Sequence, residues 1–200
     1  MARTADPTLR ATILQAARTV FQQKGYADAR MADIAAVAEV AVGTIYLYFR
    51  TKDALVMALA DDFHRRLLEE SIPELLKGDF ATAIAQSLRT TLSLMHDHQD
   101  LLAMVYLQMG LATCNEPSAV EAELTSALTA ALAERMARGE ARCYDPEKAA
   151  LLIIGLVERA VLTSVLEGEA SMSLLAETLV PFVQHALIAD QLGSKAAEKG

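Results

Sequence analysis

The residue types that most often carry enzyme or metal chemistry are sparse in this 200-residue chain. His96 and His98, with Asp97 and Asp100 beside them, form the densest group of possible metal ligands. Two residues apart on a helix, the imidazoles would point about 200° away from each other, so they could not share one ion. No Gly-x-Ser-x-Gly, phosphate-loop, His-Glu-x-x-His or paired-cysteine motif is present. The sequence therefore predicts neither a metal site nor an enzyme.

A different chemistry is indicated between Asp33 and Leu55, where the pattern is that of two short helices joined by a tight turn. Apolar residues at helical spacing break at Glu39-Val40 and then resume. The first set is Ile34, Ala35 and Ala38, and the second is Val42, Ile45 and Phe49. If Ile45 and Phe49 face inward, the residues around them face outward. These outward residues are Gly43, Thr44, Tyr46 and Leu47.

The second of these helices has the dimensions and the surface of a DNA-reading helix. It would be roughly 12 Å long and slim enough to enter a major groove. We predict that Thr44, Tyr46 and Leu47 contact bases or thymine methyl groups, and that Arg30, Tyr48 and Lys52 hold phosphates. Because no Arg or Asn lies on this face, bidentate recognition of guanine or adenine is unavailable there, and specificity should depend on methyl contacts, shape and water.

Three stretches of residues 13–59 carry a family resemblance: ILQAARTVFQQKGY, MADIA and VGTIYLYFRTKDAL. They resemble the first helix, the second helix, and the recognition helix with its exit into helix four, in the DNA-binding domain of TetR-family transcriptional regulators. The resemblance implies a homodimer that binds DNA and responds to a ligand. The GTIYLYF stretch with an alanine- and leucine-rich body also resembles the subgroup that senses long-chain acyl-CoA and represses fatty-acid degradation.

The chain departs from the family pattern at three positions. Glu39 stands in the turn where most members have glycine, and a non-glycine residue in a left-handed conformation would cost on the order of 1 kcal/mol. Ala41 stands where serine usually caps the recognition helix, which loses about another 1 kcal/mol. Arg30 stands where threonine commonly opens helix two. We expect these changes to soften or shift the choice of operator without preventing folding.

The elements that must position these residues are all helical. Alanine and leucine dominate, and no run of alternating β-branched residues predicts a strand. Helix one should run from Pro7 to about Lys24 and stop at Gly25. Its inward stripe should comprise Ile13, Ala16, Ala17, Val20 and Phe21. Helix four should continue from after Thr51 to about Pro73 as one rigid rod. Further helices are expected at 80–98, 100–112, 117–138, 146–167 and 171–191.

We therefore predict an all-α chain of about nine helices, with a three-helix helix-turn-helix head joined by a long helix to a larger body. The expected domains are a DNA-binding domain at 1–51 and a ligand-binding and dimerisation domain at 52–200. The polar MARTADPTLR start and the short apolar run LLIIGLV predict no secretion signal and no membrane span, hence a cytoplasmic protein. Two cysteines, Cys114 and Cys143, are too few for a disulfide framework.

Flexible and polarizable side chains in the body predict an adaptable apolar cavity, although methionine on a helix is also ordinary core. The predicted ligand-binding residues are Met95, Leu102, Tyr106, Met109 and Val161. The resemblance favours an effector site here, because TetR-like regulators usually bind inducers among helices four to eight.

The helix predicted at 146–167 is apolar nearly all round, which implies burial on more than one side. A twofold partner could cover it, and in TetR-like proteins the last two helices form a four-helix dimer bundle. The predicted interface residues are Leu156, Val165, Leu179, Phe182 and Val183. Glu158 and Arg159 interrupt the apolar stripe, either as exposed rim charges or as a polar anchor inside the dimer or pocket.

The formal net charge of −8 is unevenly distributed. Residues 1–55 hold seven Lys or Arg against five Asp or Glu, whereas the rest holds eleven against twenty-one. A mildly basic head on an acidic body favours orientation on DNA. We expect a homodimeric repressor that binds double-stranded DNA at a palindromic operator, needs no cofactor and is released by a small apolar effector such as a long-chain acyl-CoA. The alternatives are a helical small-molecule or lipid-binding protein that has lost DNA affinity, and an activator.

Overall fold

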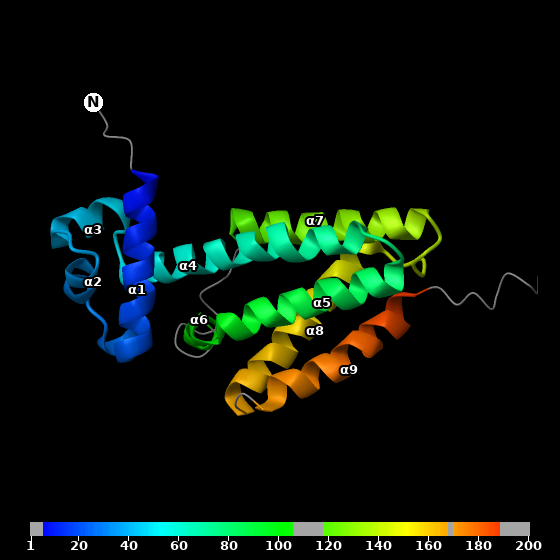
Figure 1. Ribbon diagram of the computed structural model, residues 1–200. Helices are drawn as coiled ribbons and strands as arrows, with labels where there is room; N and C mark the ends of the chain where they lie inside the picture. The colour runs from blue at the N-terminus through cyan, green and yellow to red at the C-terminus, as the bar shows by residue number, and fades with distance from the viewer. Residues whose placement is uncertain (1–5, 106–117, 168–169, 189–200) are drawn as a thin grey trace, which may run out of the picture. The chain divides into compact units, whose positions relative to one another are not determined.

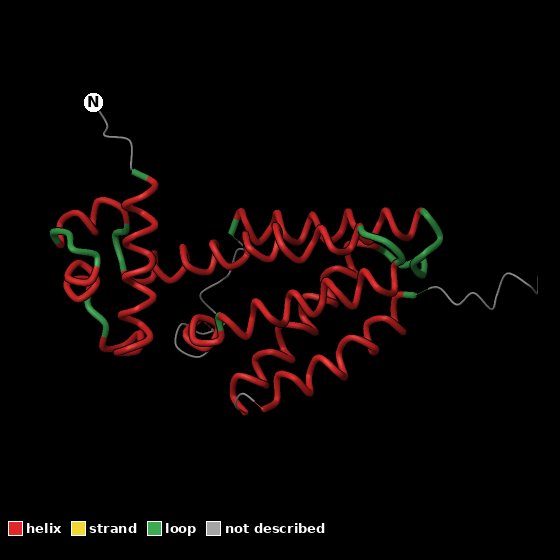
Figure 2. Tube along the Cα trace, viewed as in Figure 1, coloured by secondary structure: helices red, strands yellow, loops and turns green. Residues whose placement is uncertain are grey.

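The computed structural model describes the backbone of residues 6–105, 118–167 and 170–188, and their side chains outside residues 165–174 (Figure 1). Within these ranges the regular structure is helical, as predicted, with short connecting loops (Figure 2). The elements are α1 (Pro7–Asp28), α2 (Met31–Val37), α3 (Val42–Tyr48), α4 (Lys52–Arg66), η1 (Leu67–Ser71), η2 (Ile72–Leu76), α5 (Phe80–Asp97), α6 (Gln99–Ala103), α7 (Ala119–Ala137), α8 (Pro146–Glu167) and α9 (Ala170–Leu187).

The chain packs as two compact units that divide within α4, between Phe63 and His64. The first unit comprises Met1–Phe63 with His98–Glu116, and the second comprises His64–Asp97 with Pro117–Gly200. The functional boundary predicted after residue 51 stays a prediction. No single helix among the described residues is long and apolar enough to cross a membrane, whereas α2 and α3 reach that length and composition only as a pair, across a sharp bend.

In the first unit, α1 provides the surface against which α2 packs, and α2 contacts α3. The predicted inward stripe of α1 is confirmed, since all five of its residues are buried. The N-terminus of α1 is capped by Asp6, whose Oδ1 accepts a hydrogen bond of 2.9 Å from the amide of Thr8, with Pro7 in the first turn. The predicted stop at Gly25 is also seen, because Gly25 has a φ of 73° and interrupts the helical backbone.

The prediction of one straight helix from residue 52 to about Pro73 is wrong beyond Arg66. There α4 gives way to a π-helical turn, η1, and then to a 3₁₀ turn, η2. Two causes are visible. Pro73 has no amide hydrogen to donate to the preceding turn. In addition, the buried Ser71 hydroxyl lies 3.0 Å from the Ser87 carbonyl and 2.6 Å from Oγ1 of Thr91, which anchors this part of the chain to α5.

In the second unit, α5 packs against η2 and α9, and α8 packs against α7 and α9. The predicted start of α8 is confirmed: Oδ1 of Asp145 accepts hydrogen bonds from the amides of Glu147 and Lys148, at 3.0 and 3.1 Å. After α7, Gly139 adopts a φ of 73° and the chain turns back. These ends follow from local capping chemistry, so α7 and α8 lie close to their predicted bounds.

Arg135 holds this turn in place and was not singled out from the sequence. It is the largest fully buried side chain among the described residues, at 1% exposure. Its guanidinium donates to the carbonyls of Leu75 at 2.8 Å, Gly78 at 3.0 Å and Lys77 at 3.1 Å, and pairs with the carboxylate of Glu140. Its role is therefore to fasten α7 to the loop that connects η2 to α5.

Candidate nucleic-acid interface

The turn between α2 and α3 has the geometry of a helix-turn-helix. Residues 38–41 connect the two helices, and the chain bends by 104° between them. Glu39 has a φ of 55°, so the expected left-handed residue in the turn is present. The amide of Glu39 donates to the Ala36 carbonyl at 3.3 Å and the amide of Val40 to the Ala35 carbonyl at 3.0 Å. These bonds close the C-terminal end of α2 and set the direction of α3.

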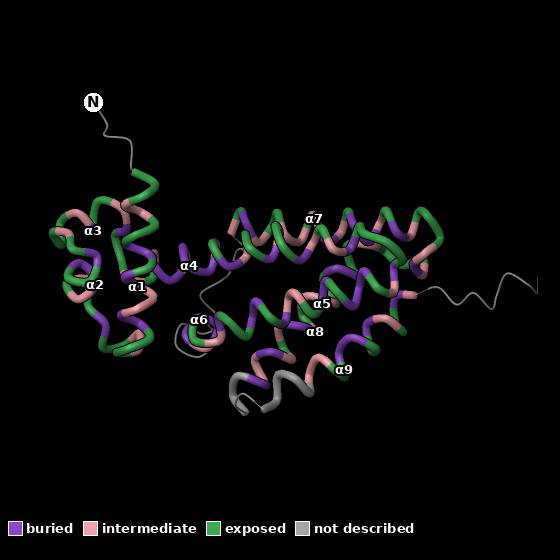
Figure 3. Tube along the Cα trace, in the orientation of Figure 1, coloured by how far each residue is buried: buried purple, intermediate pink, exposed green. Residues whose placement is uncertain are grey.

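The residues of α3 and its C-cap differ in burial, as the colours along the trace in Figure 3 show. Ile45 and Phe49 are buried, as predicted. Tyr46 and Leu47 face outward as predicted and are 49% and 84% exposed. Val42, predicted to be part of the apolar inward face, is instead 40% exposed, because three residues on a helix advance by 300° and place it about 60° away from Ile45. Thr44 lies between the two faces and is half-buried.

The start of α3 has no side-chain cap. Ala41 occupies the N-cap position, and only its carbonyl takes part, accepting from the Thr44 amide at 2.8 Å. At the start of α2, Arg30 is exposed and its amide donates to Oδ2 of Asp33 at 3.1 Å. Oδ1 of the same carboxylate pairs with Lys24 at 2.9 Å. The ion pair with Lys24, followed by the Arg30 amide, holds the pKa of Asp33 below its ordinary value.

The ammonium of Lys52 is engaged within the protein. It donates to the carbonyls of Tyr26, Ala27 and Ala29, the latter two at 3.2 and 3.0 Å, and lies 4.3 Å from the centre of the Tyr26 ring. Since an ammonium has three hydrogens, these carbonyls account for all of them. The predicted contact of Lys52 with phosphate stays a prediction, but in the structure this side chain binds carbonyls at the C-terminal end of α1.

Tyr26 completes the junction between the end of α1 and the start of α4. Its hydroxyl donates to Oδ1 of Asp53. Burial, together with the hydrogen bond and negative charge of Asp53, raises the pKa of Tyr26 to about 12. The phenol therefore stays protonated at physiological pH and keeps its donor role.

Two contacts tie the C-terminal end of α3 to other helices of the unit. The Tyr48 hydroxyl accepts a hydrogen bond of 2.9 Å from the Asp6 amide. The hydroxyl hydrogen takes no part in this bond. The Arg10 guanidinium lies 5.6 Å from the centre of the Phe49 ring and 3.7 Å from the Asp62 carboxylate. These contacts fix how the exposed face of α3 is presented.

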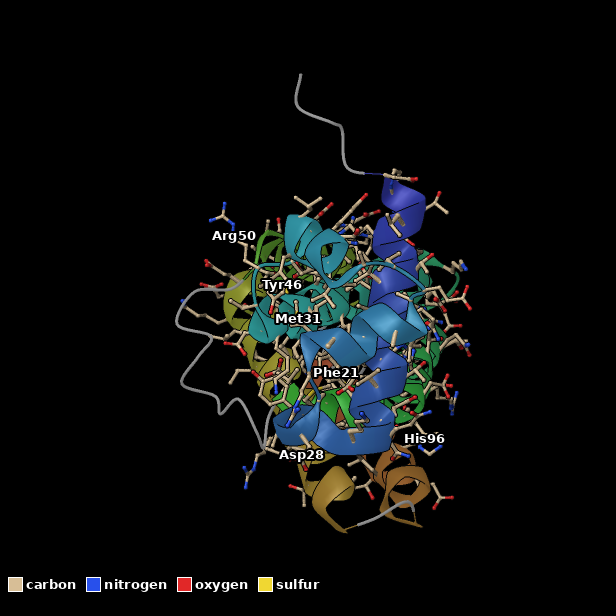
Figure 4. All side chains as sticks on the ribbon, turned by 90° about the vertical axis from the view of Figure 1, so that its left-hand side faces the viewer. Phe21, Asp28, Met31, Tyr46, Arg50 and His96 are labelled. Atoms are coloured by element: carbon tan, nitrogen blue, oxygen red, sulfur yellow. The ribbon has the colours of Figure 1, made fainter. Side chains whose placement is uncertain are left out.

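The residues directly after α3 add a cation that the predicted site set left out. Arg50 is exposed, and its side chain projects outward (Figure 4). Thr51 follows, and its Oγ1 accepts a hydrogen bond of 3.1 Å from the Ala54 amide at the start of α4. The sequence signal for Arg50 is its position directly after α3.

The described residues among the predicted ligand-binding residues lie in two different units of the structure. Met95 and Val161 are buried in the second unit, and Leu102 is buried in the first. Tyr106 and Met109 lie outside the described residues. Within the described part of the chain, no group of three or more His, Cys, Asp or Glu is placed to hold a metal ion. His98 is instead buried against Phe63, with ring centres 5.3 Å apart, and its Nε2 lies 3.5 Å from the Arg18 guanidinium.

The predicted dimer face, on α8 and α9, exposes large apolar side chains. Leu152 and Phe182 are 72% and 61% exposed, Leu151 is also exposed, and Leu156 is partly exposed. Leu179 and Val183 are buried within the chain itself, and the side chain of Val165 lies outside the described set. A shallow hollow of about 590 Å³ lies between the two helices. Its walls include Tyr144, Leu152, Ile153, Leu156, Phe182 and Val183.

A second hollow of about 370 Å³ shares Leu156 and is also lined by Arg159, Thr163, Ser164 and Thr178. Arg159 is exposed. Neither hollow is lined by Met95, Leu102 or Val161. The concave surfaces of α8 and α9 thus coincide with the predicted dimer face and not with the predicted effector residues.

Comparisons with known proteins agree with this geometry. Residues 13–59 match the family model described as bacterial regulatory proteins, tetR family. Over 96 residues the chain is 36% identical to the HTH-type transcriptional regulator YvdT of Bacillus subtilis, a match that covers 47% of this chain and 49% of YvdT. The chain thus matches about half the length of that relative.

Two solved structures have a similar fold. A TetR-family transcriptional regulator from Pectobacterium atrosepticum has a TM-score of 0.74 and 22% identity, over 92% of this chain and 96% of that one. The transcriptional regulator FadR from Bacillus subtilis, solved in complex with stearoyl-CoA, has a TM-score of 0.67 and 24% identity, over 88% of this chain and 98% of FadR. At these identities the similarity concerns the fold.

Proposed function

Because the chain belongs to the tetR family of bacterial regulatory proteins, we propose that it is a transcriptional repressor that binds a palindromic operator as a homodimer and is released by a small apolar effector. The observation that carries the proposal is the helix-turn-helix, whose α3 presents an uncharged exposed face. Its relatives are transcriptional regulators, so the chain is not an enzyme. A regulator of this kind acts on DNA in the cytoplasm.

On DNA, the exposed face of α3 meets base edges in the major groove. Tyr46 and Leu47 are directed at the bases, and Thr44 lies at the edge of this face. Arg30, Arg50 and Tyr48 hold phosphates on either side of the groove. Lys52 supports this surface indirectly, because its bonds to carbonyls at the C-terminal end of α1 hold the start of α4. The division assigns base contacts to neutral residues and backbone contacts to the flanking cations.

Arg50→Ala and Lys52→Ala separate the two kinds of contribution. In a fluorescence-anisotropy titration on the chain's own upstream DNA, Arg50→Ala should weaken binding to every sequence and flatten the dependence of affinity on salt by about two units of slope per dimer. Lys52→Ala should chiefly lower the free energy of unfolding, by about 1–2 kcal/mol, because it leaves backbone carbonyls without their donor. A flattened salt slope for Lys52→Ala with unchanged stability would place Lys52 on a phosphate instead.

The homodimer is supported by the exposed apolar face of α8 and α9. Leu152 and Phe182 are too exposed to contribute to the core of a single chain, and a twofold partner would bury them. The hollow beside them offers a receiving surface for the partner's side chains. Contact of the same two helices around a twofold axis gives a four-helix arrangement.

Leu152→Glu tests this face without disturbing the core. The variant should remain folded and elute as a monomer in size-exclusion chromatography with light scattering, whereas the unchanged protein elutes as a dimer. Leu76→Glu is the matched control, because Leu76 is also an exposed leucine but lies on η2. A dimer that persists in Leu152→Glu would remove α8 from the interface.

An apolar effector is supported by the similarity in fold to FadR, which was solved in complex with stearoyl-CoA. A long-chain acyl-CoA is therefore the first effector to test. Addition of stearoyl-CoA to the protein–DNA complex should release the DNA, and native mass spectrometry should report the bound ligand and the subunit count together. A protein that binds acyl-CoA but retains no palindromic DNA at moderate salt would be a lipid-binding protein rather than a repressor.

A further inference from the structure

Gly43 has no explanation inside the chain. It lies in the first turn of α3 with a φ outside the left-handed region, so its backbone does not require glycine. A Cβ added at Gly43 would meet no other atom within 4 Å, so packing does not require glycine either. Glycine at a helical position costs stability relative to alanine. The absence of a side chain at residue 43 therefore concerns something outside the protein that approaches α3 closely.

The neighbours of Gly43 identify the chemistry of that partner. On a helix, Leu47 lies one turn beyond Gly43 and Tyr46 one turn beyond Val42, so the four residues share one face. All of them are exposed, and none is charged or carries an amide. The face therefore offers apolar surface around a point of close backbone approach, with a single phenolic hydroxyl as its polar group.

The surroundings of this face indicate a polyanion. The exposed cations Arg30 and Arg50 lie at the start of α2 and directly after α3, where they can hold a phosphate backbone. Within the major groove, the apolar group that base pairs present is the C5 methyl of thymine. An apolar face with exposed cations at the start of α2 and directly after α3 is thus complementary to a groove that contains thymine.

We infer that α3 selects its half-site by the methyl groups of thymine, that Leu47 is the residue that reads them, and that Gly43 is kept free of a side chain so that α3 can approach the bases. The inference rests on the proposed DNA binding and specifies what is read. Leu47 determines specificity through apolar contact, and Gly43 sets the depth of α3 in the groove.

The test begins with selection of binding sites from random duplex DNA by the full-length protein. The selected duplex is then prepared with deoxyuridine in place of single thymidines, which removes only the methyl group. Each contacted thymine should cost about fourfold in affinity when it is replaced, and thymines in the flanks should cost nothing. Leu47→Ala should bind the thymine-containing duplex and the deoxyuridine-substituted duplex with equal affinity, because the residue that contacts the methyl group is gone. Leu76→Ala, a second exposed leucine, should retain the full difference.

Gly43→Ala gives an independent readout. It should lower affinity for the selected duplex by about tenfold while leaving the unfolding temperature unchanged or raised. Equal affinity for thymine and uracil duplexes, or unchanged uracil sensitivity in Leu47→Ala, would overturn the inference and leave DNA binding intact. Unchanged affinity in Gly43→Ala would overturn the close approach. Failure of the selection to enrich any duplex would instead overturn the proposed function.

Discussion

Glu39 adopts a backbone conformation that costs the protein stability, and Glu39→Gly should recover it. A φ of 55° places a side chain in the left-handed region, which costs roughly 1–2 kcal/mol for an ordinary residue. Glycine avoids this strain but loses roughly 0.5–1 kcal/mol of backbone entropy on folding. The Glu39 carboxylate is exposed and makes no hydrogen bond or ion pair with the residues that the structure describes. The net expectation is a gain of about 0.5–1 kcal/mol, equivalent to a rise of about 2–3 °C in unfolding temperature.

Differential scanning calorimetry measures this change in unfolding temperature. Gly139→Ala is the control, because it makes the reverse change and places a side chain at a left-handed position. Gly139 has a φ of 73° after α7, and a Cβ there would meet no atom within 4 Å, so alanine adds backbone strain and nothing else. Gly139→Ala should therefore lower stability by a similar amount. Glu39→Ala, which removes the charge but keeps the strain, should leave stability within about 0.5 kcal/mol. A loss of stability in Glu39→Gly would show that the turn is not strained at this residue.

Two further predictions concern polar groups that the structure brings together. Arg135→Leu should lower the free energy of unfolding by about 3 kcal/mol in urea denaturation, because three carbonyls and Glu140 lose a buried donor. Arg138→Leu, at the exposed C-cap of α7, removes only an exposed ion pair with Glu134 and should change it by less than about 0.5 kcal/mol. Asp33→Asn should destabilise the protein at neutral pH, because it removes the pair with Lys24. Since the pKa of Asp33 is lowered in the folded state, the carboxylate's contribution is full above its ordinary value near 3.8 and is lost as pH falls through the folded pKa. The difference between Asp33→Asn and the unchanged protein should therefore shrink below about pH 4, and a constant difference would contradict the assignment.

The parts of the fold that follow from neighbouring residues were predictable from the sequence. Helix ends at Gly25 and Asp145-Pro146 depend on capping and backbone preference, which act within a few residues. The buried pair Ile45 and Phe49 follows from helical spacing, as does the exposure of Tyr46 and Leu47. The same spacing misplaced Val42, because position 42 lies near the edge of the apolar stripe, where periodicity alone does not decide burial.

The parts that depend on residues distant in sequence were not predictable. The sequence places Lys52 beside the reading helix, but not beside the carbonyls of Tyr26 and Ala29, which packing brings to it. The burial of Arg135 depends on a loop about sixty residues earlier in the chain. Besides Pro73, the change from α4 to a π turn involves the contact between Ser71 and Ser87, which no local pattern indicates. In each case the side chain has several possible partners, and its actual partner is brought near only by the folding of the chain.

The weak local structure of α3 explains why its neighbours matter for function. A helix of seven residues without an N-terminal cap and with a glycine in its first turn would not be stable in isolation. It is held by the burial of Ile45 and Phe49 and by the bond between Tyr48 and the start of α1. The orientation of its exposed face is therefore set by α1 as much as by α3. A change in α1 that weakens these contacts should alter DNA recognition even though it touches no base.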